Sequence, residues 1–137
     1  MPLSPSSSAP IGVAIAGLGF GEAVHLPALG ANPHLEAVAL WHPRQERLDA
    51  ACASSGLQGY TDWDALLADP AVDAVIIATP PQPRHALALG ALQAGKHLLL
   101  EKPVALNAQQ VAELQREAIQ RRLSVAVDFE YLSLIHI

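Results

Sequence analysis

Short apolar runs alternate with segments of helical spacing along most of the chain. The first apolar run begins at Ile11 and ends in closely spaced glycines, and further runs occupy residues 35–41, 58–60, 74–78, 96–101 and 124–129. Helical spacing or helix-compatible composition occupies residues 22–31, 43–54, 61–68, 84–94 and 108–121. Parallel strands need such crossovers, and their apolar runs need helices on both faces. The pattern therefore predicts an α/β fold, a doubly wound parallel sheet of the Rossmann type with strand order 3-2-1-4-5-6.

Capping residues support two of the predicted helices. Thr61 and Asp64 have the spacing of a capping box at the start of one, and Asn107 with Gln110 caps the last. The apolar residues of that last helix are expected to share a face: Val111, Leu114 and Ala118.

The glycines that follow the first strand suggest a phosphate-binding turn. Gly17 allows a tight strand-to-helix turn, and Gly19 lets the backbone approach a pyrophosphate without an intervening Cβ. The helix that follows offers N–H groups and a partial positive charge. In such a sheet, ligands bind beyond the carboxyl ends of the strands. Polar or glycine-rich segments follow four predicted strands, at residues 17–21, 42–44, 79–81 and 101–103.

The composition restricts the class of protein. The chain has 137 residues, of which 51% are hydrophobic and 15% charged, so it is long enough for one globular domain. A net charge of −5 gives no general attraction for nucleic acid or anionic membranes. A single cysteine, Cys52, excludes an internal disulfide and fits a reducing compartment, so we expect a cytoplasmic protein. Residues 1–10 are rich in Ser and Pro and are expected to form a disordered lead-in.

Several segments resemble one enzyme family in their order and spacing. They are residues 16–19, 25–29, 73–81, 85 and 94–97, and above all Glu101-Lys102-Pro103. Residues 11–131 are thereby similar to the opening domain of the Gfo/Idh/MocA oxidoreductases, which transfer a hydride between NAD(P) and a sugar, cyclitol or related polyol.

The resemblance implies roles for particular residues. The glycine turn would hold the pyrophosphate, and Thr79, Pro80 and His85 would line the nicotinamide side. Lys102 would be catalytic, because an ammonium group on a long stem can stabilise the charge that develops on the substrate oxygen. The expected cofactor-binding residues are Gly17, Leu18, Gly19, Phe20, Gly21, His42, Arg44, Thr79, Pro80, His85 and Glu101. His25 either contacts the cofactor or packs within its helix.

Two positions depart from the usual pattern. Glu22 stands where the fingerprint has Gly or Ala, and the neighbouring Gly21 could relieve the crowding between helix and strand. The carboxylate that would bind both ribose hydroxyls of NAD after the second strand is absent. His42 stands near that position, and Arg44 and Arg47 follow it. Arginine attracts a 2′-phosphate that a carboxylate would repel, so the sequence favours NADP over NAD.

The family also leads us to expect a second domain that supplies substrate contacts and an oligomer interface. Residues 132–137 do not continue the resemblance, and we expect a truncated reading frame, with a full-length parent that is a homo-oligomer. Without that domain, the last helix and sixth strand should expose apolar surface. We expect weak turnover at most by the chain alone and, from the spacing of His and carboxylate residues, no metal site. A non-catalytic dinucleotide sensor on the same fold is the alternative function.

Overall fold

A computed structural model of the chain describes residues 9–129. The tail at residues 132–137, and all but the last two residues of the expected lead-in, lie outside the described residues.

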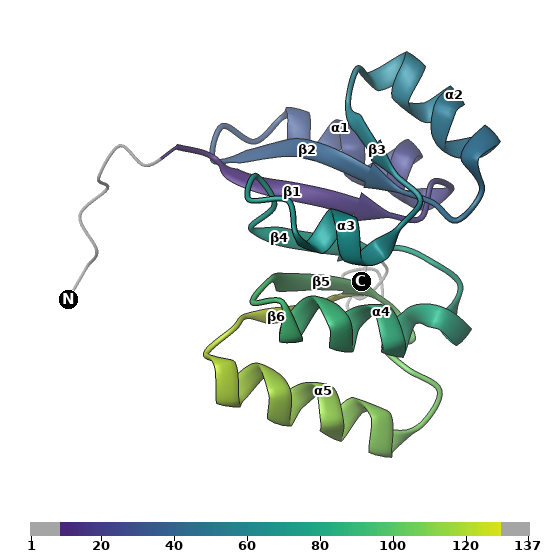
Figure 1. Cartoon of the computed structure of the whole chain (residues 1–137). Coiled ribbons are helices and arrows are strands. Elements are labelled where there is room, and N and C mark those ends of the chain that lie inside the picture. The colour runs from purple at the N-terminus through teal and green to yellow at the C-terminus, as the bar shows by residue number, and fades with distance from the viewer. Residues whose placement is uncertain (1–8, 130–137) are drawn as a thin grey trace, which may run out of the picture.

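The strands form one parallel sheet in the predicted order (Figure 1). They are β1 (Ile11–Ala16), β2 (Leu35–Trp41), β3 (Gln58–Tyr60), β4 (Ala74–Ile77), β5 (His97–Glu101) and β6 (Val125–Asp128). The order β3-β2-β1-β4-β5-β6 confirms the doubly wound Rossmann-type sheet. The order reverses between β1 and β4, so the loops after these strands diverge and leave a crevice at the carboxyl edge.

Helices cover both faces of the sheet (Figure 1). The helices α1 (Leu26–Gly30) and α2 (Gln45–Ser55) contribute to the core on one face. The π-helical turn η1 (Gly21–His25) packs against the same face, where Gly21 lies next to Ile15. The helices α3 (Trp63–Leu67), α4 (Pro81–Gln93) and α5 (Ala108–Arg121) contribute to the core on the other. In β1, Val13 and Ile15 point to the first core, and Ala14 and Ala16 to the second. This alternation follows from the two-residue period of a strand.

The starts of four helices differ from the predicted ones, and α2 begins at Gln45, two residues after the predicted start at residue 43. The first helical segment begins with a π-helical turn, in which the Leu26 N–H donates to the Gly21 carbonyl. Thr61 is not the cap of α3. Asp62 caps it instead, and its carboxylate accepts the Asp64 N–H. The helix α4 begins at Pro81, three residues before the predicted start at residue 84, because proline is tolerated at the first helical position.

The cap of α5 is confirmed, but its buried face is narrower than expected. The side chain of Asn107 accepts the Gln110 N–H. Leu114 and Ala118 are buried, whereas Val111 is 41% exposed and does not belong to that face. The expected apolar surface is present, because Ile119 on α5 is 71% exposed.

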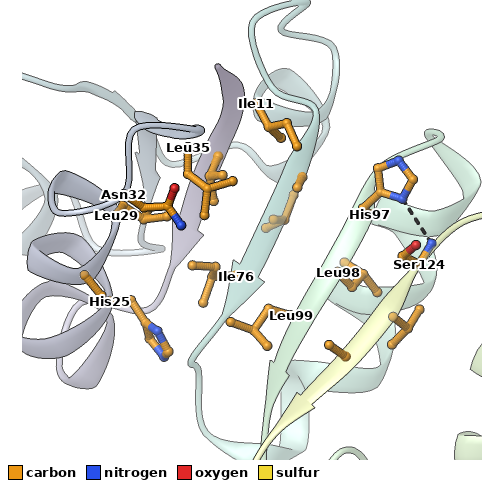
Figure 2. A pocket seen from close by; sticks show the side chains of 16 residues that line it. Ile11, His25, Leu29, Asn32, Leu35, Ile76, His97, Leu98, Leu99 and Ser124 are labelled. Atoms are coloured by element: carbon orange, nitrogen blue, oxygen red, sulfur yellow. Dashed lines mark hydrogen bonds between the residues drawn. The ribbon is translucent and has the colours of Figure 1, made fainter. Parts of the chain in front are cut away.

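An apolar groove of about 570 Å³ lies on the sheet face that carries η1 and α1. Figure 2 shows Leu29 and Asn32 on the helical side of this groove and Ile76 and Leu99 on the strand side. Val125 of β6 also lines it and is 36% exposed. Within residues 9–129, the sheet face along β4, β5 and β6 is thus incompletely covered on this side.

Among the residues that the structure describes, no helix is both long enough and apolar enough to cross a membrane.

Candidate functional site

A pocket of about 640 Å³ lies at the carboxyl edge of the sheet, where β1, β2 and β4 end. Eleven residues line this glycine-loop pocket: Gly17, Leu18, Gly19, Trp41, His42, Pro43, Arg44, Ala78, Thr79, Pro80 and Pro83. Three segments that are far apart in the sequence therefore meet at the topological switch point, which is where open α/β sheets bind ligands.

The two glycines of the loop meet different constraints. Gly17 has φ +98°, and a Cβ there would lie 2.6 Å from the Ala78 carbonyl oxygen, so the loop packs directly against the end of β4. A Cβ on Gly19 would meet no atom within 4 Å. The backbone at Gly19 thus faces open space, which is the form of a cradle that a pyrophosphate can enter closely. This geometry fits a dinucleotide.

Gly21 provides the close packing that Glu22 put in doubt. A Cβ on Gly21 would lie 2.6 Å from the Ile15 Cγ2 atom. Gly21 is buried, so it takes the position of contact between helix and strand. The crowding expected from Glu22 is thereby avoided.

The end of β2 forms one wall of the pocket. Trp41 is 9% exposed, packs edge-on against Trp63 with ring centroids 5.2 Å apart, and donates from Nε1 to the Thr61 carbonyl. His42 Nδ1 accepts the backbone N–H of Arg44 at 3.0 Å. Burial lowers the pKa of His42, and the neighbouring guanidinium groups of Arg44 and Arg47 lower it further. The side chain of Arg44 is exposed, so it is available to an anionic group in the pocket.

The segment after β4 forms the opposite wall. Thr79 is buried and Pro80 is exposed, and both line the pocket. The guanidinium of Arg84, in the first turn of α4, donates to the Thr79 carbonyl oxygen. Sequence reasoning missed Arg84, which is only 3% exposed. The signal available was a lone arginine just after the Thr79–Pro81 turn, among the apolar residues of a helix.

The segment 101–103 starts at the last residue of β5 and lies at the same edge of the sheet. Lys102 is exposed, and its peptide bond to Pro103 is cis. Glu101 is 8% exposed and its carboxylate lies 2.7 Å from His25 Nε2. Neither Glu101 nor Lys102 lines the glycine-loop pocket. Lys102 therefore lies beyond the pocket wall, directly after β5, which is the next strand along the sheet after β4.

His25, Glu101 and Asp128 form a cluster that sequence spacing does not reveal. Their ligand atoms lie within 4.8 Å of one another, and His25 Nε2 is 3.8 Å from the Asp128 carboxylate. One imidazole and two carboxylates are a donor set that could hold a divalent cation. The 2.7 Å separation between His25 and Glu101 is that of a hydrogen bond, so the cluster can instead fix the ends of β5 and β6. His25 packs within the fold and is 6% exposed.

Three further predicted residues lie outside the pocket wall. Phe20 is 37% exposed and packs edge-on against His25, with ring centroids 5.3 Å apart. His85 Nε2 lies 3.0 Å from a Glu113 carboxylate oxygen, which joins α4 to α5. Gly21 also lies behind the pocket, against β1. The pocket thus unites seven predicted residues: Gly17, Leu18, Gly19, His42, Arg44, Thr79 and Pro80.

Comparison with known proteins places this geometry in a family. The chain is 42% identical over 120 residues to an uncharacterized oxidoreductase of Synechocystis sp., covering 87% of this chain and 32% of the relative. It is 36% identical over 107 residues to a dTDP-3,4-didehydro-2,6-dideoxy-alpha-D-glucose 3-reductase of Streptomyces violaceoruber, covering 78% of this chain and 31% of the relative. The chain therefore spans about a third of the length of these curated relatives.

A solved structure of another oxidoreductase is also similar to this chain. The 3-ketoreductase KijD10 of Actinomadura kijaniata, crystallised with NADP and TDP-benzene, superposes with a TM-score of 0.85 at 32% identity. The match covers 90% of this chain and 38% of that one. The family described as oxidoreductases with an NAD-binding Rossmann fold matches residues 11–129. This chain accordingly belongs to the Gfo/Idh/MocA oxidoreductase family and folds as its NAD(P)-binding Rossmann domain.

Proposed function

We propose that this chain is the dinucleotide-binding part of an NADP-dependent oxidoreductase that acts on a hydroxyl or carbonyl carbon of a sugar-like substrate. The observation that carries the proposal is the glycine-loop pocket, in which the Gly19 backbone faces open space at the switch point of the sheet. A non-catalytic sensor would need the same pocket, so the choice of an enzyme rests on Lys102.

The proposed preference for NADP rests on the wall after β2. His42 and Arg44 line the pocket there, and no Asp or Glu is among the residues that line it. The exposed guanidinium of Arg44 can pair with a 2′-phosphate through charged, bidentate hydrogen bonds. Arg47 is not among the lining residues, so Arg44 carries the argument.

The chain's own residues would bind and orient the reactants. The loop at Gly17 and Gly19 would hold the pyrophosphate through backbone N–H groups, and Thr79 and Pro80 would support the nicotinamide half. When bound, the dinucleotide supplies the hydride acceptor or donor. Lys102 would donate a hydrogen bond to the substrate oxygen and stabilise the negative charge that develops on it. Lys102 is exposed among the described residues, so its ammonium group is accessible to a substrate.

The proposed substrate class is supported by the chemistry named for a relative. A reductase that is 36% identical over 107 residues acts on a dTDP-linked keto sugar. We propose a ketone or secondary alcohol of a sugar or sugar nucleotide as the reacting group. The rest of a longer chain would supply most of the contacts to such a substrate.

Fluorescence titration tests the proposed cofactor. Trp41 lines the pocket, whereas Trp63 does not, so the Trp63→Phe variant isolates the signal of Trp41. We expect saturable quenching by NADPH and weaker binding of NADH. Arg44→Ala should weaken NADPH binding about tenfold and leave NADH binding unchanged. Tighter binding of NADH by the parent protein would reverse the preference, and the absence of binding by a folded chain would refute the proposed function.

The Lys102→Met variant separates an enzyme from a sensor. We expect it to bind NADPH as the parent chain does, because Lys102 does not line the pocket. The natural full-length protein carrying this change should lose at least about a hundredfold in kcat with keto sugars, since the charge on oxygen is no longer stabilised. Full retention of kcat would exclude Lys102 from the chemistry, and no turnover by the unaltered protein across a panel of sugar ketones would favour the sensor.

A further inference from the structure

Arg84 is a buried cation that contacts backbone from two loops of the site. It lies near the start of α4 and is 3% exposed. Nη1 donates to the Glu101 carbonyl at 2.7 Å and also to the Pro103 carbonyl, while Nη2 donates to the Thr79 carbonyl. The acceptors thus come from the segment after β4, from the last residue of β5 and from the segment that follows β5.

The two carbonyls that Nη1 contacts are those on either side of Lys102. One nitrogen atom of Arg84 therefore binds the backbone on both sides of Lys102. Through Nη2 the same planar group reaches Thr79, which lines the glycine-loop pocket. A guanidinium presents its donors in a rigid fork, so the distance between the two loops is fixed by the shape of the group.

The burial of this charge has an energetic cost that simple packing does not require. Burial lowers the pKa of Arg84, and the negative charge of Glu101 partly opposes that effect. The Nε atom of Arg84 has no hydrogen-bond partner among the described residues. A methionine or leucine would fill a similar volume at less cost, but neither could bond three carbonyl oxygens. The bonds of Arg84 to three backbone carbonyls therefore indicate that it holds the loops in place, and not that it fills the core.

We propose that Arg84 is a positioning residue that holds Lys102 in register with the Thr79 wall of the glycine-loop pocket, without touching substrate or cofactor itself. This inference rests on the proposed function in so far as it gives Lys102 a role in the reaction. The holding of the two loops does not depend on that role and can be measured in the cofactor-free chain.

Two lysines in the chain provide an internal comparison. Lys102 follows β5 at the carboxyl edge, while Lys96 precedes it at the opposite edge, where its N–H donates to the Ala91 carbonyl at 2.9 Å. The backbone ¹⁵N order parameter of each amide can be measured by NMR in the parent chain, in Arg84→Ala and in Arg116→Ala. Arg116 is an exposed arginine on α5 and serves as the matched control.

We expect the order parameter of Lys102 to be near the rigid value of about 0.85 in the parent chain and to fall towards about 0.6 in Arg84→Ala. That of Lys96 should not change. Dinucleotide affinity of the variant, measured by Trp41 fluorescence, should be about tenfold weaker because the Thr79 wall is released. Guanidinium chloride at a concentration well below denaturation should restore both quantities, whereas methylammonium chloride at equal ionic strength should not.

Three outcomes would contradict the role proposed for Arg84. Unchanged values for Lys102 and for NADPH affinity, as in Arg116→Ala, would overturn the proposal. An equal fall at Lys96 and Lys102 would also overturn it, since Arg84 would then stabilise the whole domain alone. If Arg84→Ala does not fold, Arg84→Lys provides the same comparison with the charge retained, and a rigid Lys102 in that variant would contradict the need for a fork. Failure of the parent chain to bind NADPH would refute the proposed function, while the order parameters would still decide the role of Arg84.

Discussion

At the scale of single residues, the two glycines of the loop have different roles, one in the fold and the other in ligand binding. Gly17 adopts a left-handed φ of +98° against the end of β4, so its lack of a side chain serves the fold. Gly19 has open space where a Cβ would stand, so its lack of a side chain serves a ligand. Two residues of the same type, two positions apart, therefore have different consequences when replaced.

Gly17→Ala should lower the free energy of unfolding by about 2 kcal/mol or more, because alanine is strained at this φ and its methyl group would meet Ala78. Gly19→Ala should change stability by less than about 0.5 kcal/mol. It should still weaken NADPH binding about tenfold, because the methyl group would occupy space that the pyrophosphate needs. Urea denaturation and fluorescence titration of both variants check this pair. Equal effects of the two changes on stability would contradict it.

Asp69 makes stability depend on pH in the acid range. Its carboxylate accepts the Ala71 N–H and the Tyr60 hydroxyl, both at 2.8 Å, and these bonds hold its pKa below the ordinary value of 3.8. A carboxyl group with a lowered pKa in the folded state stabilises the fold above its unfolded pKa. That contribution is lost as the pH falls through the folded pKa.

Asp69→Asn should therefore be less stable than the parent chain at neutral pH, and the difference should shrink as the pH falls below about 4. Free energies of unfolding from urea titrations over a pH series provide the measurement. Tyr60→Phe removes one of the two bonds and should give a smaller difference with the same direction. If the difference in free energy of unfolding between Asp69→Asn and the parent chain did not vary with pH, the charge of Asp69 would not contribute to stability.

At the scale of elements, the side chains at helix starts decide where helices begin. The Thr61–Asp64 pattern and the Asn107–Gln110 pattern look alike in the sequence, but only the second places its cap as predicted. In the first, Asp62 is one residue closer to the helix and its carboxylate accepts the Asp64 N–H. Several polar residues in a row give the backbone alternative caps, and the packing of the helix selects between them.

Asn107→Ala should destabilise the domain by about 1 kcal/mol, because the Gln110 N–H at the start of α5 loses its acceptor. The exposed Gln109 lies in the same turn and provides the control, since Gln109→Ala leaves the cap intact. Thermal unfolding of both variants checks the effect. Equal melting temperatures would mean that the cap adds nothing to the tertiary contacts of α5.

At the scale of the whole molecule, the sheet is unevenly covered. Helices pack along one face from β2 to β5, but the groove of about 570 Å³ leaves apolar residues of β4, β5 and β6 accessible on the other. Buried parallel sheets normally have both faces covered, so this groove is a stretch of sheet that the helices of the described part of the chain leave partly uncovered.

A dye that fluoresces in apolar surroundings should bind the folded domain at this groove. Val125→Lys places a charge in the groove and should lower the dye fluorescence several-fold without changing the melting temperature by more than a few degrees. Gln58→Lys, on the opposite edge strand β3, adds the same charge away from the groove and should leave the fluorescence unchanged. Dye binding that is insensitive to Val125→Lys would place the exposed apolar surface elsewhere, for instance around Ile119.

The sequence by itself determined the sheet order, the glycine loop and the three loop segments that line its pocket. These features depend on local patterns: the two-residue period of a strand, the helix-compatible segments between strands, and turn residues directly after strand ends. Because the carboxyl ends of parallel strands share one edge, residues such as Gly17, His42 and Thr79 could be assigned to one site without coordinates.

Only the tertiary structure decided which polar side chains are buried in the interior and do not line that pocket. His25 meets Glu101 from 76 positions away, and Arg84 bonds backbone carbonyls up to 19 positions distant. Such contacts have no period in the sequence, since they depend on how far a side chain reaches between layers of the fold. A buried polar group must find partners wherever the packing supplies them, and that requirement is satisfied in three dimensions rather than along the chain.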